Sequence, residues 1–246
     1  MSNAKTLQNH NTILSDNNIS IDELIEGINN LPNAKTENVL EIEDAFITHT
    51  FGGDYTNDRV AIIKYGTFYE NNKLTSVSFP NVTSVEGYAF YKCSLLKNID
   101  ISKLTTAAAY AFAYTAPSVL NFPLLISAST YSFGYINSTC EVNMPQLTNI
   151  GNSCFRDSKG ITKGDFAVAS KIGPVAFYYC NNLATLILRK SDAICVLENT
   201  SAFTGTKIAD GTGLIYVPDA LVDTYKSATN WSNYANQIKP LSELEG

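Results

Sequence analysis

Polar side chains recur along the chain at a nearly constant interval. Asp100, Asn121, Asn143 and Asp165 follow one another after 21, 22 and 22 residues. Each lies in a run where apolar and polar residues alternate, so we expect strands whose polar positions face outward. Such a column of carboxylate and amide oxygens could bind a cation, a glycan or a polar protein surface; the alternative is a solvated sheet face. The neighbouring outward positions are Asn98, Glu141 and Lys163.

Tyrosines form a second periodic set. Tyr88, Tyr110 and Tyr131 each stand two residues before a phenylalanine, so we expect their rings to form a short ladder. Tyrosine is amphipathic and enriched in interfaces, which makes this ladder a candidate binding surface. Half-buried packing at the corners of the fold is the alternative interpretation.

The cysteines and histidines do not form a catalytic or metal-binding motif. The five cysteines include no CxxC pair, so a zinc site is not expected. Cys93 and Cys180 occupy one position four repeats apart, about 19 Å if successive coils rise about 4.8 Å, which excludes a disulfide between them. We expect buried structural thiols. His10 and His49 have no nucleophile placed beside them by any motif. We therefore predict no enzyme activity, no metal site and no cofactor.

These candidate residues are positioned by a repeat of about 22 residues. A small residue precedes each phenylalanine of the series, and an alternating strand-like run follows it. One such unit cannot bury its own apolar face, whereas stacked units bury a continuous core. The sequence predicts a solenoid of about seven coils around a central parallel sheet, with the polar column on its concave face. The series is Phe68, Phe90, Phe112, Phe133, Phe155, Phe177 and Phe203.

The two ends of the chain differ from the repeats. Residues 20–32 have a capping-box start and one apolar stripe, which predicts a short helix in an N-terminal arm. This helix either docks on the first coil or self-associates through residues 7–32. At the other end we expect a helix over 220–227 capped by Asp219, with Trp231 and Tyr234 folded over the last coil. The predicted parts are an arm (1–33), a first coil (34–66), the repeats (67–217) and a C-terminal cap (218–246).

The stretch "LTSVSFPNVTSVEGYAFYKCSLLKNIDI" resembles the BspA-like leucine-rich repeats. The matching features are a strand ending in proline, an apolar pair, "AF", a cysteine three residues later and then a leucine. The third to fifth units lack that cysteine, and Gly164 replaces an apolar strand residue. The resemblance implies an α/β leucine-rich-repeat solenoid in a bacterial or phage-encoded protein. Such proteins are often surface-associated, are implicated in adhesion and are not enzymes as a class, which favours the cell surface or a phage particle as the location.

Charge and hydropathy exclude some partners. The net charge is −6 and the pI about 4.9, so the basic stripe of a nucleic-acid-binding protein is missing. No apolar run is long enough to cross a membrane, and the first residues lack the apolar region of a signal peptide. The sequence thus predicts a non-catalytic module for a protein or glycan ligand. A prophage-associated assembly protein that oligomerises through residues 7–32 is the alternative.

Overall fold

The structure is a computed structural model that describes residues 39–40 and 52–244. The chain divides into two compact units, residues 1–37 and 38–246, and all the described residues belong to the second. The predicted helix over 20–32 and the self-association segment 7–32 lie outside the described residues.

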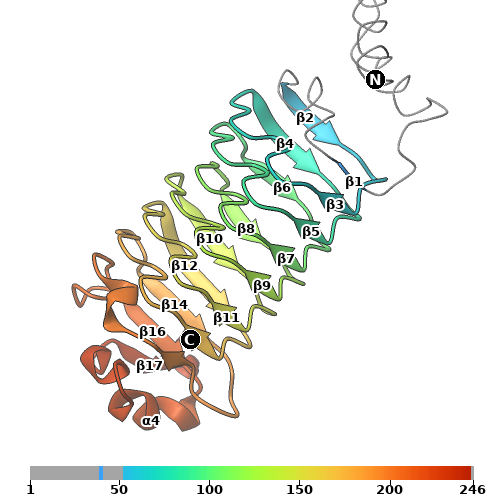
Figure 1. Cartoon of the computed structure of the whole chain (residues 1–246). Helices are drawn as coiled ribbons and strands as arrows, with labels where there is room; N and C mark the ends of the chain where they lie inside the picture. The colour runs from blue at the N-terminus through green and yellow to red at the C-terminus, as the bar shows by residue number, and fades with distance from the viewer. Residues whose placement is uncertain (1–38, 41–51, 245–246) are drawn as a thin grey trace, which may run out of the picture. The chain divides into compact units, whose positions relative to one another are not determined.

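Two kinds of strand alternate along the second unit (Figure 1). The short strands are β1 (Val39–Leu40), β3 (Ile62–Ile63), β5 (Ser84–Val85), β7 (Thr106–Ala107), β9 (Ser127–Ala128), β11 (Asn149–Ile150), β13 (Lys171–Ile172) and β15 (Val196–Leu197). The longer strands are β2 (Gly53–Thr56), β4 (Leu74–Ser78), β6 (Asn98–Asp100), β8 (Val119–Asn121), β10 (Cys140–Asn143), β12 (Ile161–Phe166), β14 (Thr185–Leu188), β16 (Leu214–Val217) and β17 (Ile238–Pro240).

Within the described residues these strands form three parallel sheets. The short strands make one eight-stranded sheet, from β1 to β15. The longer strands make a three-stranded sheet, β2-β4-β6, and a six-stranded sheet from β8 to β17. Within each sheet, a strand pairs with the equivalent strand of the next coil, as Ser84 of β5 does with Thr106 of β7. The stack of coils is visible in Figure 1 as two ladders of arrows side by side.

The leucine-rich-repeat solenoid is confirmed, but its predicted details need two corrections. The described part of the chain contains about nine turns, not about seven. The turns at the two ends contain no member of the phenylalanine series. Tyr55 of β2 and Ile238 of β17 fill the core there instead. The prediction of a single central sheet is also wrong. The segment before each phenylalanine forms a two-residue strand, which is too short to show a sequence period, and these strands add a second sheet.

The core is a continuous stack of phenylalanine rings. All seven members of the series are fully buried. Phe68 and Phe90 stand at the first step, where their ring centroids are 5.0 Å apart and the rings lie within 5° of parallel. The last step, from Phe177 to Phe203, is 5.8 Å even though four extra residues separate them in sequence. The residue before each ring is also buried, as the predicted close approach of neighbouring backbones requires.

The C-terminal end closes the stack with aromatic side chains. The fully buried Trp231 lies 6.0 Å from Phe203, and its indole Nε1 donates a hydrogen bond to the Cys195 carbonyl. Because the Trp231 ring is buried, it covers the last coil and is not accessible to a ligand. Among the described residues only one α-helix is present, the short α4 (Val222–Ser227). Asp219 does not cap it, because its carboxylate accepts a hydrogen bond from the Ser242 N–H instead.

The remaining turns of this end are 3-10 helices. They are η2 (Thr200–Phe203), η3 (Asp219–Leu221), η4 (Trp231–Tyr234) and η5 (Leu241–Glu243). The Tyr234 hydroxyl, in η4, donates to the Thr200 carbonyl of η2. This bond ties the end of the chain to the last phenylalanine-containing coil.

Truncation of one ring in the stack should destabilise the protein strongly. Phe133 stacks on Phe112 and Phe155 at 5.4 and 5.5 Å, so Phe133→Ala removes contacts on both sides and leaves a cavity. We expect a loss of about 3–5 kcal/mol in the free energy of unfolding, measured by urea denaturation. Leu124→Ala, at a side chain that is 48% exposed, is the control and should cost less than about 1 kcal/mol. Equal costs for the two variants would contradict the stacked core.

Candidate binding surfaces

The turns that carry the phenylalanines have an unusual backbone. The residues two before and two after the ring adopt left-handed φ values in most coils. Tyr88, Tyr110 and Tyr131 have φ of 58°, 58° and 57°. Gly66 occupies the position two before the ring in the first of these coils, and Gly205 the position two after the ring in the last. A bulky residue at positive φ costs on the order of 1 kcal/mol relative to its ordinary conformation, a cost that glycine avoids.

The predicted tyrosine ladder is present at these turns. Successive rings of Tyr88, Tyr110 and Tyr131 lie 4.8 Å apart at each step and are within 14° of parallel. The ladder continues to Tyr65 at one end and Tyr135 at the other, at 5.5 and 5.8 Å. Together with their neighbours these rings form a surface that we call the tyrosine edge. Its members in the described part of the chain are Tyr65, Tyr69, Tyr88, Tyr91, Tyr110, Tyr114, Tyr131, Tyr135, Tyr178 and Tyr179.

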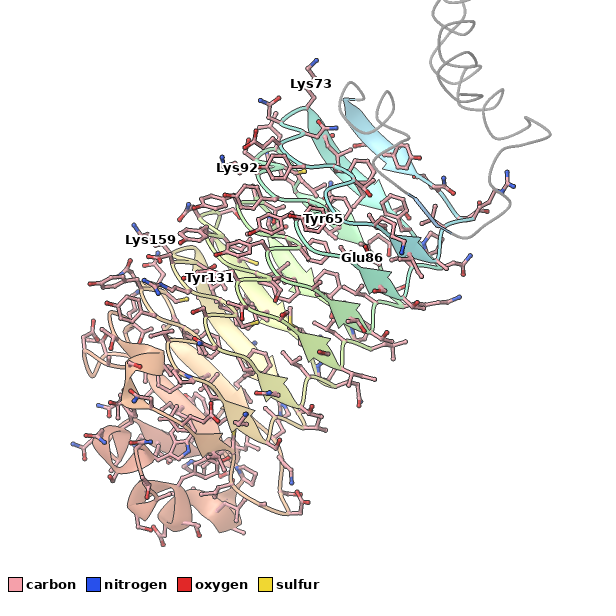
Figure 2. All side chains as sticks on the ribbon, viewed as in Figure 1. Tyr65, Lys73, Glu86, Lys92, Tyr131 and Lys159 are labelled. Atoms are coloured by element: carbon pink, nitrogen blue, oxygen red, sulfur yellow. The ribbon has the colours of Figure 1, made fainter. Side chains whose placement is uncertain are left out.

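Cationic side chains lie against this edge. The Arg156 guanidinium lies 4.9 Å from the centre of the Tyr178 ring and 5.9 Å from that of Tyr131. The Lys92 ammonium is 5.3 Å from the centre of the Tyr91 ring. In Figure 2, Lys92 and Tyr131 lie along the turns that lead into the longer strands, and Tyr65 lies nearer the short strands. The sequence did not indicate Arg156, because the rings it contacts belong to different coils.

The sheet face carries the other predicted site residues. Asn98, Asp100, Asn121, Glu141 and Asn143 are exposed there. Lys163 and Asp165 are half-buried. The residues do not form one column, because Asp100 belongs to the three-stranded sheet and Asn121 begins a separate sheet. Within the larger sheet, Asn143 lies between Asn121 and Asp165 as predicted.

Many of these polar groups are already paired with one another. Asn143 donates to the Asn121 side chain at 2.8 Å, and Ser78 donates to Asp100 at 2.8 Å. Asp165 accepts two hydrogen bonds from the Arg189 guanidinium, with a closest distance of 2.9 Å. The sheet face is therefore a set of cross-strand pairs rather than a row of free carboxylates.

The next outward position along this face is an exception to the predicted pattern. Ile187 pairs in register with Asp165 on one side and with Tyr216 on the other. Alternation places it on the open face, but its side chain is fully buried. The exposed polar face therefore ends before β14.

The cysteines have a structural role that the sequence pattern did not explain. The thiols of Cys93 and Cys180 each donate a hydrogen bond to the phenylalanine carbonyl of the previous coil, at 3.0 Å. The Ser158 hydroxyl makes the same bond at 2.7 Å. A serine hydroxyl can therefore replace the cysteine thiol at this position, and Ile136 shows that an apolar side chain also fits there. All five cysteines are buried and free.

A family comparison identifies the repeat. The family model for the BspA type leucine rich repeat region matches this chain in six copies, over residues 61–184 and 105–212. These matches together span more than half of the 246 residues.

The chain belongs to the BspA-type leucine-rich repeat family. Proteins of this family are generally non-catalytic, and the repeat is typical of protein-interaction or adhesion modules. The chain is also similar to the crystal structure of a leucine-rich repeat protein from Bacteroides ovatus ATCC 8483. That match has 14% identity and a TM-score of 0.36, and it covers 69% of this chain and 56% of the other. No curated protein matches the chain.

A cluster of metal ligands and a membrane-spanning helix are both absent from the described residues. Across residues 39–40 and 52–244, no three histidine, cysteine or acidic side chains come together as a metal site would require. The helices of the same part of the chain are too short or too polar to cross a membrane.

The buried thiols should make the protein sensitive to alkali. Burial raises the pKa of all five thiols. The pKa is about 12 for Cys93, Cys140, Cys154 and Cys195, and that of Cys180 is also strongly raised. An unfolded thiol has a pKa of about 8.5, so above that pH the unfolded state loses protons that the folded state keeps. Stability is therefore full below about pH 8.5 and falls as pH rises, by about 2 kcal/mol per thiol between pH 8 and pH 10.

Urea denaturation at pH 8, 9 and 10 tests this. The matched variant is Cys93→Ser with Cys180→Ser, which keeps the donor that Ser158 supplies elsewhere. It should lose less stability than the unmodified protein over the same range. Identical pH profiles would show that the thiols are not the cause.

Proposed function

We propose that the repeat region is a non-catalytic, adhesion-type binding module whose tyrosine edge contacts a protein or glycan ligand. The observation that supports this most directly is the backbone at the tyrosine positions. Gly66, two residues before Phe68, shows that this position accepts glycine, which avoids the cost of positive φ. Tyrosine recurs at these positions all the same, at Tyr88, Tyr110 and Tyr131.

Stacking roughly offsets this cost. One aromatic pair contributes about 0.5–1.5 kcal/mol beyond its buried area, and a left-handed tyrosine loses about the same amount. The rings therefore add little net stability to the fold. Their value is better explained by what they offer at the surface, where Tyr88, Tyr110 and Tyr131 are half-buried and the neighbouring Tyr65 is 60% exposed.

The composition of the edge supports a contact surface. Tyrosine provides rigid, amphipathic area at low entropy cost, and serine and asparagine add adaptable hydrogen bonds. Both kinds of residue stand in these turns: Ser94 and Asn137 lie beside Tyr114 and Tyr135 in one groove. Arg156, which contacts two of the rings, is of a type enriched in interface hot spots.

The sheet face is the second candidate surface. Asn98, Asp100, Asn121, Glu141 and Asn143 are exposed, as a ligand would require. Their cross-strand hydrogen bonds would have to be exchanged for bonds to a ligand, so they offer less net gain. We therefore rank this face below the tyrosine edge.

Replacing the ladder should separate binding from folding. We expect Tyr88→Gly, Tyr110→Gly and Tyr131→Gly together to weaken ligand binding at least tenfold, because buried interface tyrosines often contribute more than about 2 kcal/mol each. The melting temperature should fall by only a few degrees, since relief of positive φ offsets most of the lost stacking. Surface plasmon resonance against panels of purified extracellular-matrix proteins and of soluble polysaccharides measures the first effect, and calorimetry the second.

The control for this experiment is Asn121→Ala with Asn143→Ala on the sheet face. This pair should bind within about twofold of the unmodified protein. If the sheet-face pair loses binding and the tyrosine variant keeps it, the assignment to the edge is wrong. If the unmodified protein binds no member of either panel, the proposed function itself fails.

A further inference from the structure

Beside the tyrosine ladder lies an open groove that crosses four coils. One wall is the column two residues after each phenylalanine, and the other is the column four residues after it. The first column is Glu70, Lys92, Tyr114 and Tyr135, and the second is Asn72, Ser94, Ala116 and Asn137. The groove has a volume of about 560 Å³.

The backbone fixes the spacing of the first column. Glu70, Lys92, Tyr114 and Tyr135 have φ between 56° and 62°. The N–H of each donates to a carbonyl of the next coil, as Glu70 does to Tyr91 at 2.7 Å and Tyr135 does to Arg156 at 3.0 Å. The four side chains are therefore held at the interval of the coils, about 4.8 Å. A rigid row of this kind is pre-organised, so a ligand does not have to order it.

The charges of the groove cancel. The Lys92 ammonium lies 2.8 Å from the Glu70 carboxylate, and these are the charged side chains among the described lining residues. The remaining lining groups are hydroxyls, amides and backbone. Burial raises the pKa of Tyr114, and burial together with the neighbouring Tyr114 raises that of Tyr135 to about 12. Both phenols keep their protons, and so their donor capacity, throughout the neutral range.

The rings present hydroxyls rather than open faces. Tyr114 and Tyr135 are stacked at 4.3 Å and within 5° of parallel, and the edge of Tyr91 lies against Tyr114 at 5.4 Å. A ligand in the groove therefore meets ring edges and O–H groups. This chemistry suits a polyhydroxylated molecule better than an apolar side chain, which would need a free ring face or a hydrophobic pocket.

The ligand must also match the repeat of the surface. We propose that the groove binds an uncharged linear polysaccharide lying along the stack of coils, an assignment that rests on the proposed binding function. Each coil offers the same two positions at the same interval, so a chain with one unit per coil places every unit beside a lining residue of each column, although the side chains differ from coil to coil. A sugar unit is close in length to one coil spacing. An extended peptide advances about 3.3 Å per residue and turns alternate side chains away, so it does not stay in register with coils about 4.8 Å apart.

Isothermal titration calorimetry of the full chain tests the proposal. The probes are neutral β-glucan, mannan and xylan, with heparin as the anionic probe and gelatin as the protein probe. We expect at least one neutral polysaccharide to bind, with an affinity that rises with oligosaccharide length until the four coils are spanned. Binding should change less than twofold between pH 6 and pH 9 and between 50 and 500 mM salt, because no net charge is involved.

The decisive variant is Tyr114→Phe with Tyr135→Phe, which removes two hydroxyls and keeps the stacked rings. It should weaken polysaccharide binding about tenfold, since each lost hydrogen bond contributes a factor of several. The matched control is Tyr216→Phe on the sheet face, which should leave binding unchanged.

Three outcomes of the polysaccharide measurements would overturn the proposal. They are the absence of binding to every neutral polysaccharide, binding only to heparin with a steep dependence on salt, and an unchanged affinity in the Tyr114/Tyr135 variant. Binding to gelatin that is lost when the ladder tyrosines are replaced would overturn this inference and leave the proposed function intact. In that case the tyrosine edge would be a protein-binding surface.

Discussion

The stacking of one phenylalanine per coil is the interaction on which the other features depend. The rings are fully buried and lie 5.0–5.8 Å apart at every step from Phe68 to Phe203. This spacing brings the backbones of neighbouring coils into hydrogen-bonding range, so the residue before each ring has to be small. It also explains the C-terminal end, where Trp231 covers the last ring and prevents exposure of the core.

The same constraint shapes the surface. The chain must turn sharply on either side of each buried ring, and left-handed residues make those turns. Residues at these positions cannot pack into the core, and their N–H groups are bonded to the next coil. Their side chains are therefore displayed outward at a fixed interval. The tyrosine ladder and the neighbouring groove are two such columns, which is why both extend along the stack and not around a single coil.

The sequence is sufficient to predict the repeat, the buried rings and the ladder, because each recurs at an interval of about 22 residues over several coils. It is not sufficient for the two-residue strands, since Ser84–Val85 and its equivalents are too short to show alternation. It also misjudges the cysteine position. Cys93 looks specific in one unit, but Ser158 makes the same hydrogen bond in another coil and Ile136 fills the position with an apolar side chain. The left-handed tyrosines could not be predicted, because conformational preference favours glycine or asparagine at such positions.

The polar residues of the sheet face show that residue type and spacing are weaker evidence for a ligand site than the hydrogen bonds and ion pairs that the side chains already make. Asp165 has the charge and the register of a ligand-binding group, but Arg189 holds it in a bidentate ion pair. Asn143 is exposed, but its amide is bonded to Asn121. A ligand gains little from groups that must first give up partners, because only the difference between old and new hydrogen bonds contributes to affinity. Tyr114 and Tyr135 also interact with each other through their hydroxyls, but a hydroxyl that bonds one neighbour keeps acceptor capacity for a ligand. Their stacked rings stay fixed at left-handed backbone positions and border an open groove, so binding is more favourable there than at the paired groups of the sheet face.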